Sequence, residues 1–168
     1  ELASAVLVTS CEQMALAVRE QIEVQLQQLR RESIARRSID AFGAIIVAQD
    51  LAEAIRFSNR IAPEHLELAV RDPFAILPQI RHAGAIFMGH HTPEAAGDYL
   101  AGPNHTLPTG GTARFFSPLS VDDFVKKSSI ISLSAAGLQR LGEDIVQIAE
   151  LEGLEAHGRS VSLRLAGT

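Results

Sequence analysis

A glutamate and a histidine stand side by side directly after Pro63, where a helical pattern gives way to a strand-like one. The imidazole of His65 titrates near neutral pH and can accept a proton from a substrate, while the carboxylate of Glu64 can orient the ring or activate water. The dipeptide alone is a weak signal, because most such pairs are surface pairs. Glu64 and His65 are therefore candidates for an acid–base pair that other residues must support.

A second group of polar residues lies near a loop rich in Gly, Pro, Thr and Asn, which runs from Gly102 to about Ser117. Asp98 ends a short helical stretch before this loop, and His105 lies within it. Zinc accepts carboxylate and imidazole ligands, but this spacing matches no simple zinc finger or metalloprotease pattern. Stabilisation of the loop is the default interpretation, and metal binding is the alternative.

A further histidine, His157, follows Glu152 near the C-terminus, with Gly153 between them favouring a turn. By themselves these residues indicate an exposed polar stretch. The sequence has no glycine-rich dinucleotide fingerprint after a strand, no Walker loop and no serine nucleophile elbow. Its one cysteine, Cys11, excludes an intrachain disulfide and suits a reducing compartment.

The elements that would position these residues alternate between strand and helix up to about residue 100. Apolar runs predict strands over 5–9, 43–48, 66–70 and 85–88. Apolar spacing and capping residues predict helices over 11 to about 37, over 50–61 and over 72 to about 82, and a short helix that carries Asp98. Short connections between such elements are typical of a parallel, three-layer (Rossmann-like) α/β unit, whose sites lie at the carboxyl ends of the strands.

Only helical periodicity follows the loop, from Ser120 to the C-terminus, with breaks near Ser134 and Gly153. A lone helical tail of this size buries too little apolar surface to be stable by itself. We therefore expect a partial α/β half-domain over 1–119 and a helical tail over 120–168. The tail should dock on the α/β unit or on another chain.

The composition excludes several classes of function. The chain is 46% hydrophobic and 21% charged, which is the balance of a soluble globular protein. A net charge of −5 provides no field that would attract nucleic acid. No apolar run approaches the roughly 18 residues of a membrane span, and no basic-then-apolar signal opens the chain. We expect a cytoplasmic protein without a nucleic-acid or membrane partner.

Taken together, these clusters resemble the histidinol dehydrogenase family over essentially the whole chain. Several motifs in the right order carry the resemblance: Ala62–Glu67, Thr92–Tyr99, Gly102–Gly111, Ala113–Ser117, Asp123–Phe124 and Leu154–His157. The resemblance implies oxidation of L-histidinol to L-histidine in two NAD-dependent steps, through an aldehyde held on the enzyme. It also implies a zinc ion and a homodimer with shared active sites.

The resemblance further implies a role for each candidate residue. Glu64 and His65 match the catalytic pair: His65 would take the proton from the alcohol and later from the hydrated aldehyde, and Glu64 would activate the water. Asp98 matches a zinc ligand, and His157 matches another that reaches across from the partner subunit. Substrate-binding roles are implied for His65, Asp98, His105, Glu152 and His157, and no residue is identified for NAD.

Part of the family's site does not match any residue of this chain. The other two zinc ligands of the family, a glutamine and a histidine three residues later, lie just before the strand that opens the sequence, and the cofactor-binding domain precedes them. We therefore expect a truncated chain that does not oxidise histidinol alone. Two alternatives stay open: a non-catalytic remnant that dimerises or binds a partner, and a different zinc hydrolase that uses Glu64 and His65.

Overall fold

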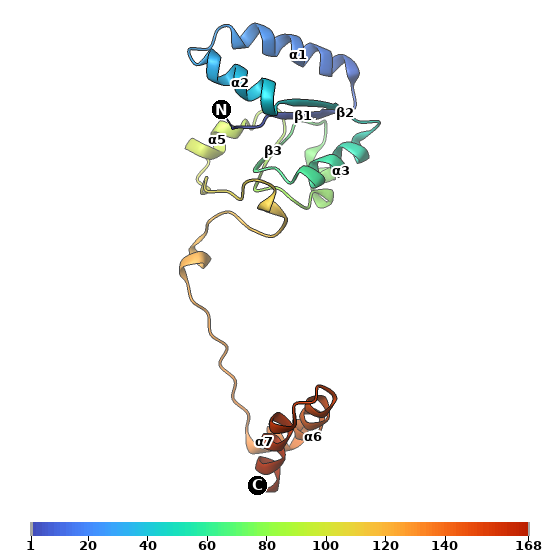
Figure 1. Cartoon of the computed structure of the whole chain (residues 1–168), viewed down its shortest axis with the longest axis vertical. Helices are drawn as coiled ribbons and strands as arrows, with labels where there is room; N and C mark the ends of the chain where they lie inside the picture. Colours follow the sequence, from blue (N-terminus) through green and yellow to red (C-terminus); the bar gives the residue numbers. More distant parts are fainter. Residues whose placement is uncertain (1, 168) are drawn as a thin grey trace. The chain divides into compact units, whose positions relative to one another are not determined.

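The computed structural model describes residues 2–167, which form two compact units divided between Phe124 and Val125 (Figure 1). The first unit contains the strands, and the second contains two helices joined by a tight turn. The α/β class with a helical tail is therefore confirmed. Among the described residues, no helix has both the length and the apolar composition that crossing a membrane requires.

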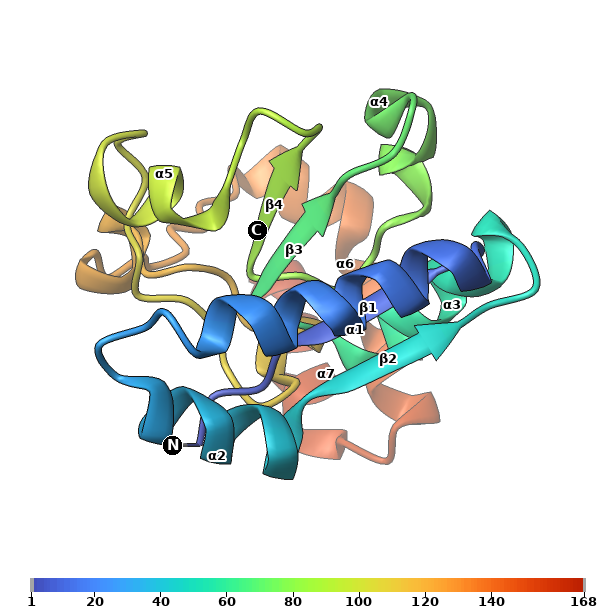
Figure 2. The same cartoon turned by 90° about the horizontal axis from the view of Figure 1, so that it is seen from above.

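The first unit opens with two parallel strands and the helices that cover them. β1 (Val6–Thr9) pairs with β2 (Ala44–Val47), with Val6 opposite Ala44. Between these strands the chain forms α1 (Glu12–Leu26) and α2 (Glu32–Phe42). α1 packs on this sheet from one side, and α3 (Leu51–Ile61) contacts β1 from the other (Figures 1 and 2). The sheet is thus the middle of three layers.

The prediction of one helix from Cys11 to about Arg37 is wrong, because the chain turns back at residues 27–31. A continuous helix of that length would reach about 40 Å, whereas a four-residue strand spans about 13 Å. The chain must return to the end of the sheet where β2 begins, and α2 provides that return. Arg36 then ties the two helices together by donating two hydrogen bonds to Glu23, each 2.8 Å long.

A second pair of parallel strands carries the candidate residues. β3 (His65–Leu68) pairs with β4 (Ala85–Met88), with His65 opposite Ala85, so the described strands form two two-stranded sheets. α4 (Pro73–Ile76) and a 3-10 turn (Leu77–Gln79) connect them, which is shorter than the predicted helix to about residue 82. Pro78 lacks the backbone N–H that a continuing helix needs.

The two faces of this second sheet differ in character. Leu66 and Leu68 of β3 contribute to an apolar core with Ile55 of α3 and Ile76 of α4. Because successive side chains of a strand point to opposite faces, His65 and Glu67 lie on the other face. That face is where α5 (Glu94–Tyr99) lies.

The second unit is a helical hairpin of α6 (Ala135–Leu151) and α7 (Glu155–Ala166). The predicted breaks are confirmed: the Ser134 side chain accepts a hydrogen bond from the Gly137 N–H at 3.1 Å, and Gly153 turns the chain with φ +70°. Between Ser120 and Ser134 the predicted helical structure is wrong, apart from a 3-10 turn over Val121–Phe124. Serines and β-branched residues, which are poor helix formers, dominate residues 128–132.

Candidate functional site

The backbone of Glu64 and His65 is held by the end of α3 and by the first residue pairs of the β3–β4 ladder. Buried Ala62 adopts the left-handed conformation with φ 53°, which ends the helix and redirects the chain. The Ala85 N–H donates to the Glu64 carbonyl at 2.8 Å. A Cβ on Gly84 would lie 2.5 Å from that carbonyl, so the close approach requires glycine.

The short helix α5 lies against the same sheet face as His65. The Glu94 N–H at its start donates to the Glu67 carboxylate at 2.8 Å, which links the helix to β3. Near its end, Gly97 lies so close to the ring of Phe87 that an added Cβ would be 2.6 Å from Cε1. These two contacts hold α5 against Glu67 of β3 and Phe87 of β4, which lie opposite each other in the sheet.

His65, Glu94 and Asp98 form a compact cluster between α5 and β3, here called the His65 cluster. The His65 Nε2 atom lies 3.6 Å from Glu94 Oε1 and 3.7 Å from Asp98 Oδ1, and the ligand atoms of all three residues lie within 4.8 Å of one another. These distances exceed those of a hydrogen bond. Among the described residues, the buried Nε2 therefore has no hydrogen-bond partner, although 27% of the side chain is exposed.

The electrostatics of the cluster shift the pKa of one carboxyl group, that of Glu94. Burial raises the pKa of Glu94, and a hydrogen bond with Asp98 and the charge of that carboxylate raise it further, while His65 acts in the opposite direction. One imidazole and two carboxylates also match the ligand types of zinc. The cluster is thus chemically suited both to proton transfer and to holding a divalent cation.

The structure brings together two of the six predicted site residues, His65 and Asp98. Glu64 is half-buried beside His65, and within residues 2–167 its side chain has no hydrogen-bond or ion-pair partner. His105 is exposed in the loop of the first unit. Glu152, at the end of α6, and His157, in the first turn of α7, are exposed in the second unit. The roles predicted for these four residues stay predictions.

Glu94 is a site candidate that the sequence reasoning missed. The available signal was its spacing of four residues from Asp98, which places both carboxylates on one face of a helix. The expected location at the carboxyl ends of the strands is also wrong for this cluster, since His65 is the first residue of β3. α5 folds back over the sheet face instead of leaving the sheet edge, because Glu67 accepts a hydrogen bond from its first N–H.

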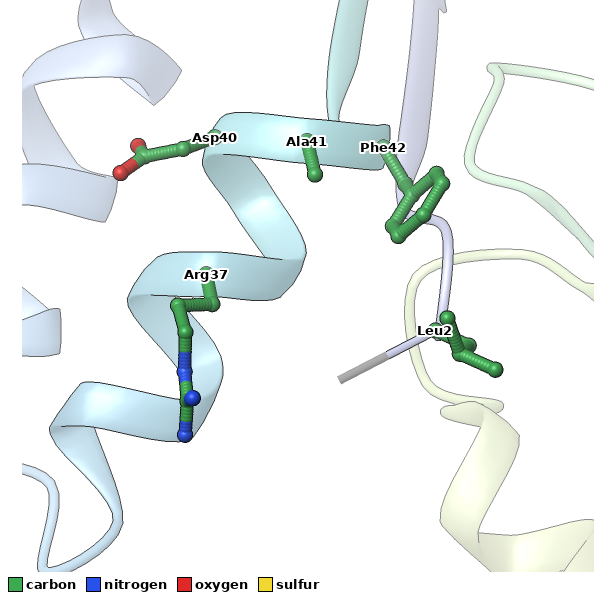
Figure 3. A pocket seen from close by; sticks show the side chains of 5 residues that line it. All are labelled: Leu2, Arg37, Asp40, Ala41 and Phe42. Carbon is green, nitrogen blue, oxygen red and sulfur yellow. The ribbon is translucent and has the colours of Figure 1, made fainter.

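A shallow depression in the first unit contains none of these residues. Its lining is Leu2, Arg37, Asp40, Ala41 and Phe42, and Figure 3 shows that it lies between α2 and the start of the chain. Apolar side chains form most of this lining, and its two charged side chains, Arg37 and Asp40, have opposite charges. Such a lining is not suited to acid–base or metal chemistry. The His65 cluster is therefore the candidate site of the first unit.

The parallel α/β unit and its imidazole–dicarboxylate cluster define an α/β protein with a site suited to proton transfer and metal binding. The sequence model of the family described as histidinol dehydrogenase matches residues 1–165. The chain belongs to the histidinol dehydrogenase family, which confirms the resemblance carried by its motifs. Because dehydrogenases are oxidoreductases, the family is one of oxidoreductases.

Individual relatives agree with this assignment. Histidinol dehydrogenases from Syntrophotalea carbinolica and Geobacter sulfurreducens are each 73% identical over 165 residues, which is 98% of this chain. The crystal structure of histidinol dehydrogenase from Elizabethkingia anophelis matches with a TM-score of 0.87 and 41% identity over 96% of this chain. The chain spans 38% of the length of the two sequence relatives and 37% of that structure.

Proposed function

We propose that this chain forms part of the active site of a histidinol dehydrogenase, which oxidises L-histidinol to L-histidine through the aldehyde. One observation carries the proposal: within residues 2–167, His65 Nε2 is free of hydrogen bonds and lies 3.7 Å from Asp98, in a chain that the family model matches almost throughout. A base needs an available nitrogen beside groups that stabilise its protonated form, and the two neighbouring carboxylates are such groups.

In this proposal the residues of the chain move protons and activate water. His65 Nε2 takes the proton of the alcohol in the first oxidation. Glu64 activates the water that adds to the aldehyde, and His65 then takes a proton from the hydrate in the second oxidation. NAD, when bound, would accept the hydride, with one NAD molecule consumed in each of the two oxidations.

We further infer a zinc site that includes Asp98. The cluster can accommodate the ion, because the ligand atoms of its three residues lie within 4.8 Å of one another and a carboxylate oxygen such as that of Asp98 binds zinc. Asp98 would hold the ion in the first unit, and His157 would do so from the second unit of a partner subunit. The ion would fix the imidazole and amine of histidinol in place, so that the gain comes from positioning. His105 and Glu152 are assigned to the substrate.

A homodimer with shared sites is the expected partner arrangement. The second unit supports it, because Ile148, Leu151 and Leu163 of its two helices are 57%, 88% and 65% exposed. Apolar side chains exposed to this degree on a small hairpin are stabilised when another surface covers them. We assign the activity to the cytoplasm, in agreement with a free and exposed Cys11.

The test compares this chain alone with a complete enzyme. A hybrid would be made by replacing the matching 165 residues of the Geobacter sulfurreducens enzyme with this chain. With zinc, NAD and histidinol, we expect the hybrid to form NADH, its His65→Asn variant to form none, and the 168-residue chain alone to form none. A folded, zinc-loaded hybrid without activity would contradict the proposed function. NADH formation by the chain alone would contradict the need for further residues.

A further inference from the structure

Glu94 is the member of the His65 cluster to which no role has been assigned. Its Oε1 atom lies 3.6 Å from His65 Nε2, as near as the corresponding oxygen of Asp98 at 3.7 Å. Once Nε2 carries a proton, a small rotation of either side chain would convert the 3.6 Å approach into a hydrogen bond. Glu94 therefore lies within reach of the ring nitrogen that the proposed function uses.

The backbone of Glu94 is fixed relative to the strand that carries His65. Its N–H donates to the Glu67 carboxylate at 2.8 Å, and Glu67 is two residues from His65 on the same face of β3. The ring of His65 also lies against Phe87, with centroids 5.9 Å apart and planes inclined by 41°. A carboxylate beside Nε2 and an aromatic ring beside the imidazole together restrict how the imidazole can turn.

The two carboxylates of the cluster have different tasks under the proposed function. A carboxylate that binds zinc has its charge directed at the metal, which leaves less of it for a neighbouring imidazolium. Glu94 is the other carboxylate near Nε2, on the same helix face one turn before Asp98. It is in place to support the ring while Asp98 holds the ion.

We propose that Glu94 is a positioning residue for His65, and that its carboxylate attracts the imidazolium formed when Nε2 takes a proton and so holds the ring in the cluster. The inference rests on the proposed function, since it assumes that His65 is the base. A purely structural role has a different signature. As the first residue of α5, Glu94 also stabilises the helix through its charge near the N-terminus. Loss of that effect would lower the stability of the fold and would not act on the His65 ring in particular.

The test uses Glu94→Gln and Glu94→Asp in the hybrid enzyme, with the exposed Glu20→Gln on α1 as the matched control. Loss of orientation of about 1 Å lowers catalysis by about a hundredfold, so we expect Glu94→Gln to lower kcat by about tenfold to a hundredfold. The KM for histidinol and the zinc content should stay at the values of the unchanged hybrid. Glu94→Asp, which keeps the charge, should recover part of kcat, and Glu20→Gln should change nothing.

A second readout follows the ring itself in the 168-residue chain. The nuclear Overhauser effect between the rings of His65 and Phe87 should weaken in Glu94→Gln and persist in Glu20→Gln. Unchanged kcat in Glu94→Gln, with His65→Asn inactive, would overturn this inference and leave the proposed function standing. Loss of zinc in Glu94→Gln would also overturn it, because Glu94 would then be a ligand. An active His65→Asn variant would overturn the proposed function itself.

Discussion

The contact between Gly97 and Phe87 gives a sharp test of how α5 is held over the sheet. A Cβ on Gly97 would lie 2.6 Å from Phe87 Cε1 and 2.9 Å from Cζ, whereas carbon atoms in contact normally lie about 3.5–4.0 Å apart. Phe87 is 6% exposed and has little room to withdraw. Gly97→Ala must therefore displace α5 or the ring by about 1 Å.

The expected stability change is the difference of two opposing effects. Overpacking at a buried contact costs about 1–3 kcal/mol, and alanine gains about 1 kcal/mol over glycine inside a helix. Gly97→Ala should thus lower the free energy of unfolding by about 1 kcal/mol. With Phe87→Leu the ring atoms that meet the new methyl are gone, so the same substitution should raise stability by up to about 1 kcal/mol. The sign of the effect therefore reverses with the residue at position 87.

The assay is urea denaturation of the four chains of this mutant cycle, followed by circular dichroism and fitted for the free energy of unfolding. Ala95→Ser is the control, because Ala95 is on the exposed side of the same helix and should change stability by less than about 0.5 kcal/mol. If Gly97→Ala stabilises the chain by about 1 kcal/mol with Phe87 in place, the glycine is free of the ring and the reasoning is refuted.

Three further predictions follow from contacts elsewhere in the chain. Gly158→Ala should raise the urea midpoint, because a Cβ there would meet its neighbours at 3.6 Å or more. Gly142→Ala should lower the midpoint, because its Cβ would lie 2.6 Å from a leucine of α7. Equal shifts of one sign would contradict this. Asn59→Ala should lower the free energy of unfolding by about 1–3 kcal/mol in the same assay, since the amide donates to one backbone carbonyl at 2.9 Å and accepts from two backbone N–H groups; no loss would refute it. The Arg36 guanidinium lowers the pKa of Glu23, so this pair should stabilise the fold above the ordinary carboxyl range and lose that effect as the pH falls through the lowered pKa. A carboxyl NMR titration should show the pKa of Glu23 rising in Arg36→Ala, and an unchanged pKa would count against the ion pair.

Local signals in the sequence located most elements of the fold. Asp50 and Asp72 were expected to open helices, and each side chain accepts a hydrogen bond from the N–H three residues later, at 2.7 and 3.1 Å. The turn between α1 and α2 was missed because apolar spacing continues through it, and only the distance back to β2 requires the chain to reverse. A local period does not contain that long-range constraint.

The candidate site was predictable in part. The motifs around His65 and Asp98 identified both residues, and the structure places them 3.7 Å apart. Glu94 was missed because its nearness to His65 depends on how α5 packs on β3, through Glu67 and Gly97. Sequence spacing shows that Glu94 and Asp98 share a helix face, but it does not show which strand residue that face meets.

The most direct test of the central claim is a crystal structure of the hybrid enzyme with zinc and histidinol. We expect an anomalous zinc peak about 2.0–2.2 Å from an Asp98 oxygen. We also expect the histidinol hydroxyl within hydrogen-bond distance of His65 Nε2. Zinc bound away from Asp98, or a substrate hydroxyl directed away from His65, would contradict the claim that this cluster performs the chemistry.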